Sequence, residues 1–352
     1  MEKYSQFRDK GTAIAPFLPV PPPPVSIVWT PIYAFLFLCR IPFVVGLSIL
    51  HFGIVEWLPL GGRVKYAVLW ALLGVTGVWW VDFQVDGVKR GKLSTSKEHL
   101  PQAGTIIASS FTSPLDPLYL AGIFQPIFTR SYPNTRKVEP ITLLRAILLA
   151  FAPPAILPED PTKLVTLASL VAANPKSIIC VFPECTTTNG RGILPLSPSL
   201  LGATPDTKIY PVNLRYSPQD VTTPVSGAVL RWLYRLLSKP SHQMRVRIAM
   251  RVFNSAAIDA PGRPERAVAS GYDANIFDTP ALRNGNANGI AALEAETGMH
   301  VAPGADGEVS AAEQRVLDRV AEDLARLGRV KRVGLDVGDK IEFLKVWLKR
   351  RR

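Results

Sequence analysis

A long apolar stretch near the N-terminus constrains the fold of this chain more than any other feature. It runs from residue 25 to residue 83 and follows an N-terminal arm, residues 1–24, that is polar and then proline-rich. About 20 apolar residues suffice for a helix to cross a bilayer. The stretch holds two blocks near or above that length, Ser26–Leu60 and Val64–Val81, joined by a very short connector. We therefore predict a hydrophobic helical hairpin over residues 25–83, which crosses the membrane twice or dips in and returns.

Charged residues and prolines leave the position of this hairpin in the membrane open. Arg40 and Pro42 break the first block, and Trp79 and Trp80 close the second at interface depth. An apolar core hairpin of a soluble domain remains an alternative. The stretch begins too late and runs too long for the apolar region of a signal peptide. Basic residues flank it on both sides, so we expect both flanks to face the cytosol. These residues are Lys3, Arg8 and Lys10 before the stretch, and Lys89, Arg90 and Lys92 after it.

The charge balance narrows the class of partner. The chain has 352 residues, a formal net charge of +12 and a mean hydropathy of +0.17. A basic surface favours anionic partners. The high hydropathy favours phosphorylated or acidic lipids over nucleic acid, for which no motif is present. The cysteines, Cys39, Cys180 and Cys185, are too few and too scattered for a disulfide framework or a zinc site. We expect a reducing, cytosol-facing location with no metal, no bound cofactor and no nucleic acid.

Residues 84–253 have the pattern of a globular α/β domain. Short apolar runs bounded by turn-forming residues predict buried strands, and longer runs between them predict helices. Strands that alternate with helices indicate a central, mostly parallel sheet flanked by helices. The expected strands are Gly104–Ser109, Ser177–Phe182 and Lys208–Leu214, and the expected helices are Leu118–Phe128 and Lys163–Ala173. A further apolar run, Ile141–Leu157, fits either a core helix or part of an acyl-chain groove on the membrane.

The C-terminal third divides into two parts. Residues 254–310 are rich in Ala, Gly, Asn, Pro and Asp and lack periodicity, which indicates a flexible linker or insertion. Residues 311–352 contain a helical pattern over Ala311–Leu327 and a basic amphipathic tail from Lys340 to Arg352. This tail fits a helix on the membrane surface or a solvated, charge-capped helix. Its expected apolar face consists of Ile341, Leu344, Trp347 and Leu348.

Two short segments hold most of the candidate site residues. The first is Ser110–Asp116 (SFTSPLD), and the second is Phe182–Gly190 (FPECTTTNG) followed by Arg191. A third element, Tyr210-Pro211-Val212, ends the expected third strand. Hydroxyl, carboxylate and cationic side chains gather in these segments within an otherwise apolar chain. Together they provide the groups that a phosphate-bearing lipid substrate would need.

The first segment resembles a motif of the glycerolipid acyltransferase family, which includes the lysophosphatidic acid acyltransferases. That motif is Asn-His-x-Ser-x-x-Asp. Here Ser113 and Asp116 stand at the Ser and Asp positions, while Ser110 and Phe111 replace Asn and His. In the family the histidine takes the proton of the attacking hydroxyl and the aspartate orients the ring. The resemblance therefore implies catalytic roles for Asp116 and Ser113. The general base of the motif is missing, because Phe111 stands at the histidine position.

The second segment resembles the family's third motif, Phe-Pro-Glu-Gly-Thr-x-x-x-Gly, with Cys185 in place of the first glycine. Pro211 matches the fourth element, whereas the second motif has no clear counterpart between Leu143 and Pro158. Cations, hydroxyls and backbone N–H groups in the loop could bind the acceptor phosphate. Glu184 could fix the loop or bind glycerol hydroxyls. The substrate-binding residues implied by the resemblance are Glu184, Thr186, Thr187, Asn189, Gly190, Arg191 and Pro211.

The resemblance implies acyl-CoA-dependent acylation of a lysophospholipid, with lysophosphatidic acid converted to phosphatidic acid in glycerolipid and triacylglycerol synthesis. Acyl-CoA is then a cosubstrate. The implied location is the endoplasmic reticulum membrane, the lipid-droplet surface or both, with the catalytic domain on the cytosolic side. The alternative is a catalytically degenerate lipid-binding or scaffold protein at the same membranes.

Phe111 cannot carry a proton, so three possibilities stay open for the base. Asp116 could act alone, with its pKa raised by an apolar site. Another histidine could be brought in by the fold, with His99 nearest in sequence and His242 next, ahead of His51 and His300. The site could also bind lipid without turnover or keep only proximity catalysis. Loss of a general base costs about 10²–10⁴-fold.

Nucleophilic catalysis is the less favoured interpretation. Ser113 lacks the Gly-x-Ser-x-Gly elbow of a hydrolase, and a helix N-cap or turn role ahead of Pro114 explains it more simply. Cys185 would likewise need a base and is better explained as a small loop residue.

Overall fold

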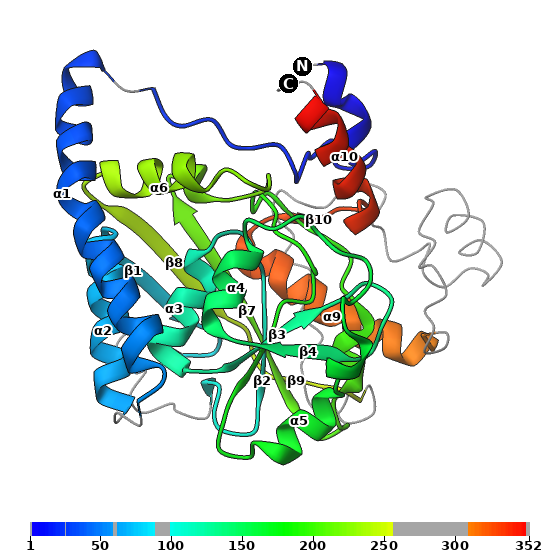
Figure 1. Ribbon diagram of the computed structural model, residues 1–352. Coiled ribbons are helices and arrows are strands. Elements are labelled where there is room, and N and C mark those ends of the chain that lie inside the picture. The colour runs from blue at the N-terminus through cyan, green and yellow to red at the C-terminus, as the bar shows by residue number, and fades with distance from the viewer. Residues whose placement is uncertain (1, 25, 59–61, 89–98, 256–308, 350–352) are drawn as a thin grey trace.

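The computed structural model describes residues 2–24, 26–58, 62–88, 99–255 and 309–349 (Figure 1). Most of the expected linker, residues 254–310, therefore lies outside the described residues. The same holds for Lys89, Arg90, Lys92, His300 and the last three arginines.

A central sheet organises the globular part. Its strand order is β1-β8-β7-β2-β5-β3-β4, with β9 paired to β7. The pairs β1–β8, β7–β2, β2–β5 and β5–β3 are parallel, so the expected mostly parallel sheet is confirmed. The strands are β1 (Val78–Val85), β2 (Ile106–Ser109), β3 (Ile127–Ser131), β4 (Val138–Ile141), β5 (Ile179–Val181), β7 (Lys208–Ser217), β8 (His242–Ile248) and β9 (Val252–Phe253). A second small sheet pairs β6 (Gly192–Ile193) with β10 (Lys331–Arg332).

Helices cover both faces of this sheet. Successive strand residues point to opposite faces, so each strand contributes side chains to the apolar core on either side. In β2, Ile107 packs with the helices α2 (Gly62–Val75) and α3 (Leu115–Phe124), whereas Ile106 and Ala108 pack with α9 (Ala311–Gly328). Cys180 of β5 is fully buried in the first of these cores, as a small hydrophobe would be. The remaining helices are α4 (Leu143–Leu149), α5 (Leu167–Ala173), α6 (Val229–Ser238) and α10 (Val337–Lys349).

Two expected helices have shifted bounds. The segment expected as a helix over Leu118–Phe128 ends earlier, since Gln125 adopts a left-handed backbone (φ 44°) and β3 begins at Ile127. The apolar run continues across this junction, so the sequence pattern does not mark it. The helix expected from Lys163 begins at Leu167, where the Thr166 side chain accepts a hydrogen bond from the Ser169 N–H. N-caps of this kind set helix starts.

The apolar N-terminal stretch forms α1 (Thr30–Ile49), a π-helical segment (Leu50–Val55) and α2. Arg40 and Pro42, which interrupt the apolar block, both lie inside α1, and the Arg40 guanidinium donates to carbonyl oxygens of Leu237 and Pro240 at the end of α6. Within the described residues, Ile27–Val55 is the one helix long and apolar enough to cross a membrane. The hairpin that crosses twice therefore stays a prediction.

The second apolar block differs from its expected form. The helix α2 ends at Val75, and Trp79 and Trp80 lie in β1 with more than two thirds of each side chain exposed. Leu72 and Leu73 of α2 are buried against the domain. This block therefore docks on the sheet, and the tryptophans do not close a helix.

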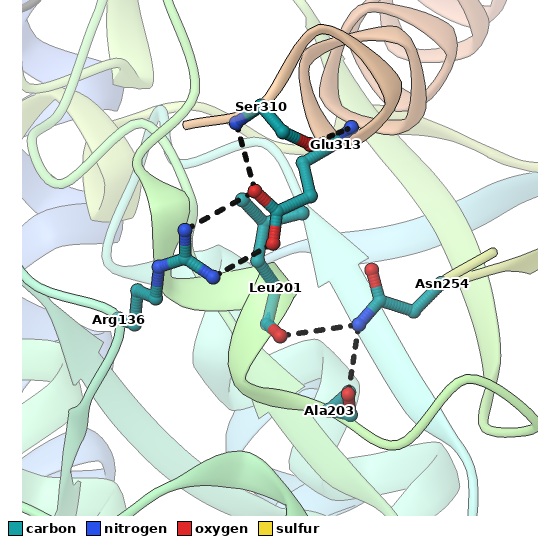
Figure 2. Close-up of polar contacts among 6 residues, drawn as sticks. All are labelled: Arg136, Leu201, Ala203, Asn254, Ser310 and Glu313. Atoms are coloured by element: carbon teal, nitrogen blue, oxygen red, sulfur yellow. Dashed lines mark hydrogen bonds and ion pairs between the residues drawn. The ribbon is translucent and has the colours of Figure 1, made fainter. Parts of the chain in front are cut away.

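The N-terminus of α9 matches its sequence pattern. Ser310 and Glu313 form a reciprocal capping box, and Glu313 also pairs with Arg136 (Nη1–Oε1 2.7 Å; Figure 2). Nearby, the Asn254 side chain donates to the carbonyl oxygens of Leu201 and Ala203 (Figure 2). These contacts fix the chain on either side of the segment that lies outside the described residues.

The two ends of the chain lie side by side (Figure 1). The fully buried Phe343 ring of α10 lies against the rings of Tyr4, Phe7 and Phe17 of the N-terminal arm. The helix begins at Val337, earlier than expected, and its buried face consists of Val337, Lys340, Phe343 and Leu344. The tail helix thus packs on the N-terminal arm and buries a lysine.

Candidate functional site

The two motif segments meet at the carboxyl ends of neighbouring parallel strands. The turn of residues 110–114 follows β2 and leads into α3, and the loop of residues 182–191 follows β5. The Thr188 N–H donates to the Phe111 carbonyl oxygen at 3.0 Å, which joins the turn to the loop. In open α/β sheets this edge is the usual ligand-binding position.

Asp116 holds the turn together from the first turn of α3. It is fully buried and accepts hydrogen bonds from the Thr112 N–H (2.6 Å), the Ser113 N–H (2.9 Å) and the Thr112 hydroxyl (3.1 Å). The Tyr216 hydroxyl of β7 donates to its other oxygen. Burial raises the pKa of Asp116 to about 6, and these hydrogen bonds limit the rise. The carboxylate is thus a structural anchor of the turn.

Phe111, at the position where the motif has histidine, makes an apolar contact. Its ring stacks on Phe182 with centroids 4.5 Å apart, and 4% of the residue is exposed. The cavity beside it has a volume of about 30 Å³ and is lined by Phe111, Arg130 and Thr186 among others. This volume is that of about one water molecule. Arg130, at the carboxyl end of β3, was not expected from the motifs.

Among the described histidines, none contacts Asp116. The His242 ring nitrogen Nε2 lies 2.8 Å from the Leu236 carbonyl oxygen, at the end of α6. His51 is buried beside α1, and His99 lies near Gly87. The protonatable side chain within reach of Asp116 is the hydroxyl of Tyr216, whose pKa is raised well above its usual value by burial.

The Ser113 hydroxyl links the turn to a third segment. It donates to the Val221 carbonyl oxygen at 2.9 Å and accepts from the Leu115 N–H at 3.4 Å. The N-cap of α3 is Pro114, so the expected N-cap role of Ser113 is wrong in position. Its catalytic role stays a prediction, and its visible role is to hold residue 221 against the turn.

Glu184 is a second buried carboxyl group in the loop. It is 1% exposed and accepts from the Leu194 N–H at 3.1 Å. Burial raises its pKa to about 8, and Asp116 adds to the rise, while the N–H groups of Leu194 and Phe111 and the charge of Lys340 oppose it. The position between residues 111 and 194 fits the loop-fixing role expected for Glu184.

The backbone at Cys185 has the conformation that a glycine adopts most readily. Its backbone φ is +58°, in the left-handed region that glycine adopts without steric cost. Burial raises the pKa of the Cys185 thiol to about 12, so it is not ionised near neutral pH. Nucleophiles require the thiolate. The geometry therefore supports the interpretation of Cys185 as a loop residue.

A lysine from the far end of the chain completes this loop. Lys340 of α10 is 1% exposed, and its ammonium donates to the Thr186 hydroxyl (2.8 Å), the Thr187 carbonyl (2.6 Å) and the Thr187 hydroxyl (3.0 Å). Burial lowers the pKa of Lys340 to about 7, and Glu184 opposes that shift. The sequence analysis placed no site residue in the tail. The missed signal was the spacing of the lysine. Lys340 precedes Phe343 by three residues and Leu344 by four, which places it on the apolar side of the helix.

The remaining loop residues contact the N-terminal arm or solvent. The Asn189 side chain donates to the carbonyl oxygens of Ala15 (2.7 Å) and Leu18 (2.9 Å). Gly190 has a φ of +71°, and Arg191 is exposed. Pro211 lies in β7 beside Ala108 of β2. Their roles in substrate binding stay predictions.

Thr223 connects both segments through its main chain. Its N–H donates to the Thr112 carbonyl at 2.9 Å, and its carbonyl accepts from the Thr187 hydroxyl at 2.6 Å. A continuous path of hydrogen bonds therefore runs from Lys340 through Thr187, Thr223 and Thr112 to Asp116.

Comparison with known proteins points to one class of relative. No family model matches the chain. The "Putative lysophosphatidic acid:oleoyl-CoA acyltransferase" of Schizosaccharomyces pombe is 25% identical over 256 residues, which cover 71% of this chain and 84% of that protein. The "Lysophosphatidic acid:oleoyl-CoA acyltransferase 1" of Saccharomyces cerevisiae is 28% identical over 197 residues, 56% of this chain and 61% of that protein. The chain, whose motif turn and loop join at one sheet edge, is thus similar to these fungal acyltransferases, and the two matches support a family relationship with them.

Proposed function

We propose that this protein transfers an acyl group from acyl-CoA to the free hydroxyl of lysophosphatidic acid, which yields phosphatidic acid. The glycerol oxygen forms a bond to the acyl carbon, the C–S bond of the thioester breaks, and the hydroxyl proton leaves with the CoA thiol. The observation that carries the proposal is that the two motif segments lie together, since the Thr188 N–H of the loop donates a hydrogen bond to the Phe111 carbonyl oxygen of the turn. The names of both relatives point the same way.

The geometry supports catalysis by alignment of the two substrates. Both oxygens of Asp116 already accept hydrogen bonds, and the carboxylate is fully buried. Phe111 offers no proton acceptor. Alignment of a nucleophile and an acyl donor can itself lower the barrier by several kcal/mol. We therefore assign Asp116 the role of fixing the turn in its working shape. We therefore expect a slower turnover than that of an acyltransferase with a histidine at the position of Phe111.

Membrane attachment fits the substrate. The helix α1 has no buried residue, and Phe35, Leu38 and Phe43 are among its exposed apolar side chains. Lysophosphatidic acid and its product reside in membranes. We place the protein on the endoplasmic reticulum membrane or lipid-droplet surface, with the sheet domain on the cytosolic side, as the basic residues near α1 favour.

The deciding experiment measures transfer from labelled acyl-CoA to lysophosphatidic acid by the purified full chain in detergent micelles. Wild type, Asp116→Ala and the matched surface variant Asp206→Ala are compared, since Asp206 is exposed and lies outside the site. Turnover in wild type and Asp206→Ala, with strong loss in Asp116→Ala, supports the proposal. Lipid binding without any wild-type turnover would contradict acyl transfer and favour a lipid-binding protein.

A further inference from the structure

A cavity next to both motif segments has no role in the reaction as described so far. Its volume is about 80 Å³. A water molecule takes about 30 Å³ in the liquid, so the cavity admits a phosphate-sized group but not a whole lipid. It is lined by residues 222–225, by Arg231, Trp232 and Arg235 of α6, by Pro19 of the arm and by Trp347 of α10.

The cavity contains two cations that the fold does not use. Neither the Arg231 nor the Arg235 guanidinium makes a hydrogen bond or ion pair within the described part of the chain, although Arg235 is half-buried. Asp220, on the same wall, is paired with Lys239 through Oδ2, and its Oδ1 has no hydrogen-bond partner among the described residues, so its charge also acts on Arg235. The net charge facing the cavity is therefore positive, and free guanidinium groups match phosphate oxygens in geometry and charge.

Thr223 lines the same cavity, and its hydroxyl is buried without a partner in the described part of the chain. Thr223 is 4% exposed, and its Oγ1 has no hydrogen-bond partner among the described residues. A buried polar group left unpaired costs about 1–3 kcal/mol. Both main-chain groups of Thr223 bond to the site, one to Thr112 and one to Thr187. A ligand that bonds this hydroxyl would therefore contact a residue that is itself hydrogen-bonded to both motif segments.

The loop hydroxyls of Thr186 and Thr187 each accept a hydrogen bond from Lys340, and that of Thr187 also donates to the Thr223 carbonyl. Lys340 donates to the hydroxyls of Thr186 and Thr187, and an ammonium group has three donors, all of which are used here. Arg191 is exposed and lies beyond Asn189, which faces the N-terminal arm. Other donors lie near the site, with Arg130 in the small cavity beside Phe111 and Arg191 at the surface. The larger cavity differs because Arg231, Arg235 and Thr223 line it together.

We propose that this cavity is a phosphate-monoester subsite, in which Arg231 and Arg235 hold the phosphate oxygens and Thr223 Oγ1 donates to one of them. A monoester carries about −1.5 to −2 charges at neutral pH, which matches the two free guanidinium groups. The inference rests on the proposed function where it assigns this phosphate to lysophosphatidic acid. The 3′-phosphate of CoA has the same chemistry and is the other source.

The helix α6 is suited to a lipid phosphate. Leu230 and Tyr234, on its other side, are exposed apolar residues, and α6 packs along α1. A lipid headgroup could therefore reach Arg231 and Arg235 from the surface that carries the exposed apolar side chains, with its acyl chain left in the membrane.

The test titrates the full chain in detergent micelles and follows tryptophan fluorescence, because Trp232 and Trp347 line the cavity. The probes are lysophosphatidic acid, lysophosphatidylcholine, CoA and inorganic phosphate. Arg231→Gln and Arg235→Gln should each weaken binding of lysophosphatidic acid by about tenfold, as for lost charge-assisted hydrogen bonds. Binding of lysophosphatidylcholine, a diester, should not change. The matched control is Arg251→Gln, since Arg251 is exposed outside the cavity.

Thr223→Val separates binding from folding. Removal of an unpaired buried hydroxyl should leave the melting temperature unchanged or higher, yet weaken binding of lysophosphatidic acid about threefold to tenfold. A role in folding alone would lower the melting temperature and leave the affinity intact, which would overturn the role of Thr223.

The remaining outcomes decide between sources and against the subsite. Weaker CoA binding in the arginine variants, with lysophosphatidic acid unaffected, would keep the subsite and assign it to the cosubstrate. Unchanged binding of all four probes would overturn it, as would a loss confined to Arg191→Gln. Arginine-dependent binding of lysophosphatidic acid without wild-type turnover would keep the subsite and overturn acyl transfer.

Discussion

The two motif segments are stabilised in opposite ways. The turn of residues 110–116 is held by its own aspartate, which among the described residues bonds one side chain from outside the turn, that of Tyr216. The loop of residues 182–191 depends on both ends of the chain, through Asn189 to residues 15–18 and through Thr186 and Thr187 to Lys340. The carboxylate that shapes the turn therefore lies within it, although the turn also bonds to residues 188, 221 and 223. The side-chain contacts of the loop reach both ends of the chain.

Asp116→Asn should have the largest effect. The three donors of the turn bond one carboxylate oxygen and the Tyr216 hydroxyl donates to the other, so the amide NH₂ would meet Tyr216, and the charge that strengthens all four hydrogen bonds would be lost. We expect at least about a hundredfold loss of kcat/KM, comparable to the loss of a group that orients a catalytic site. The measurement is acyl transfer, with Asp206→Asn as the exposed control. Retained activity would show that the turn does not depend on its carboxylate.

Lys340→Met should weaken the loop and leave the turn intact. The substitution removes three hydrogen bonds and a buried charge while it keeps the apolar stem. We expect about a tenfold rise in the KM for the acceptor and faster amide hydrogen exchange in residues 186–189. Lys345→Met, on the exposed side of α10, is the matched control. Unchanged exchange in the loop would show that α10 does not hold it.

The pH dependence of activity tests whether the turn needs Asp116 in its ionised form. The pKa of Asp116 is raised to about 6, and all its partners are donors, so its ionised form fits the turn. Activity should fall as the pH drops through about 6. The Tyr216 hydrogen bond lowers this pKa, so Tyr216→Phe should move the acid limb to higher pH. A limb that stays in place or moves to lower pH would contradict this coupling.

Stability should change with pH in the opposite sense to activity. The folded state raises the pKa of Asp116 above its usual value of 3.8, so between about pH 4 and 6 the folded protein binds more protons than the unfolded one. The contribution of Asp116 to stability is present below about pH 4 and is lost as the pH rises through about 6. Comparison of melting temperatures for wild type and Asp116→Asn across this range would isolate that contribution.

Cys185→Gly should have the smallest effect. Glycine relieves the left-handed backbone strain at this position but costs chain entropy in the unfolded state, so we expect a stability change within about 1 kcal/mol and unchanged turnover. Cys180→Gly, in the buried strand β5, should destabilise the protein clearly more. Denaturant unfolding of both variants makes the comparison. A large loss at Cys185 would assign the thiol a role beyond the loop backbone.

The features that sequence patterns predicted are those with local causes. The strands around residues 106–109 and 179–181 follow from short apolar runs, and the helix from Ala311 follows from its periodicity. Both motif segments were located, and the structure joins them. The start of β3 was missed because a left-handed Gln125, not a glycine, ends α3.

The features that sequence patterns missed depend on distant partners. Arg40 is tolerated inside an apolar helix because carbonyl groups about 200 positions away accept its hydrogen bonds. Lys340 lies in a helix whose pattern is typical of a surface helix, and only the packing against the N-terminal arm reveals its burial. Arg231 and Arg235 belong to no motif, and their interest comes from the cavity they share with Thr223.

The contact between Lys340 and Thr186 also sets an order of events during synthesis of the chain. The two residues are 154 positions apart, which corresponds to roughly ten seconds or more of translation at about 5–20 residues per second. Throughout that interval the apolar α1 is already available to a membrane, while the loop lacks its lysine. A nascent chain can thus reach the lipid surface before its acceptor loop is complete, and the site matures only when α10 has left the ribosome.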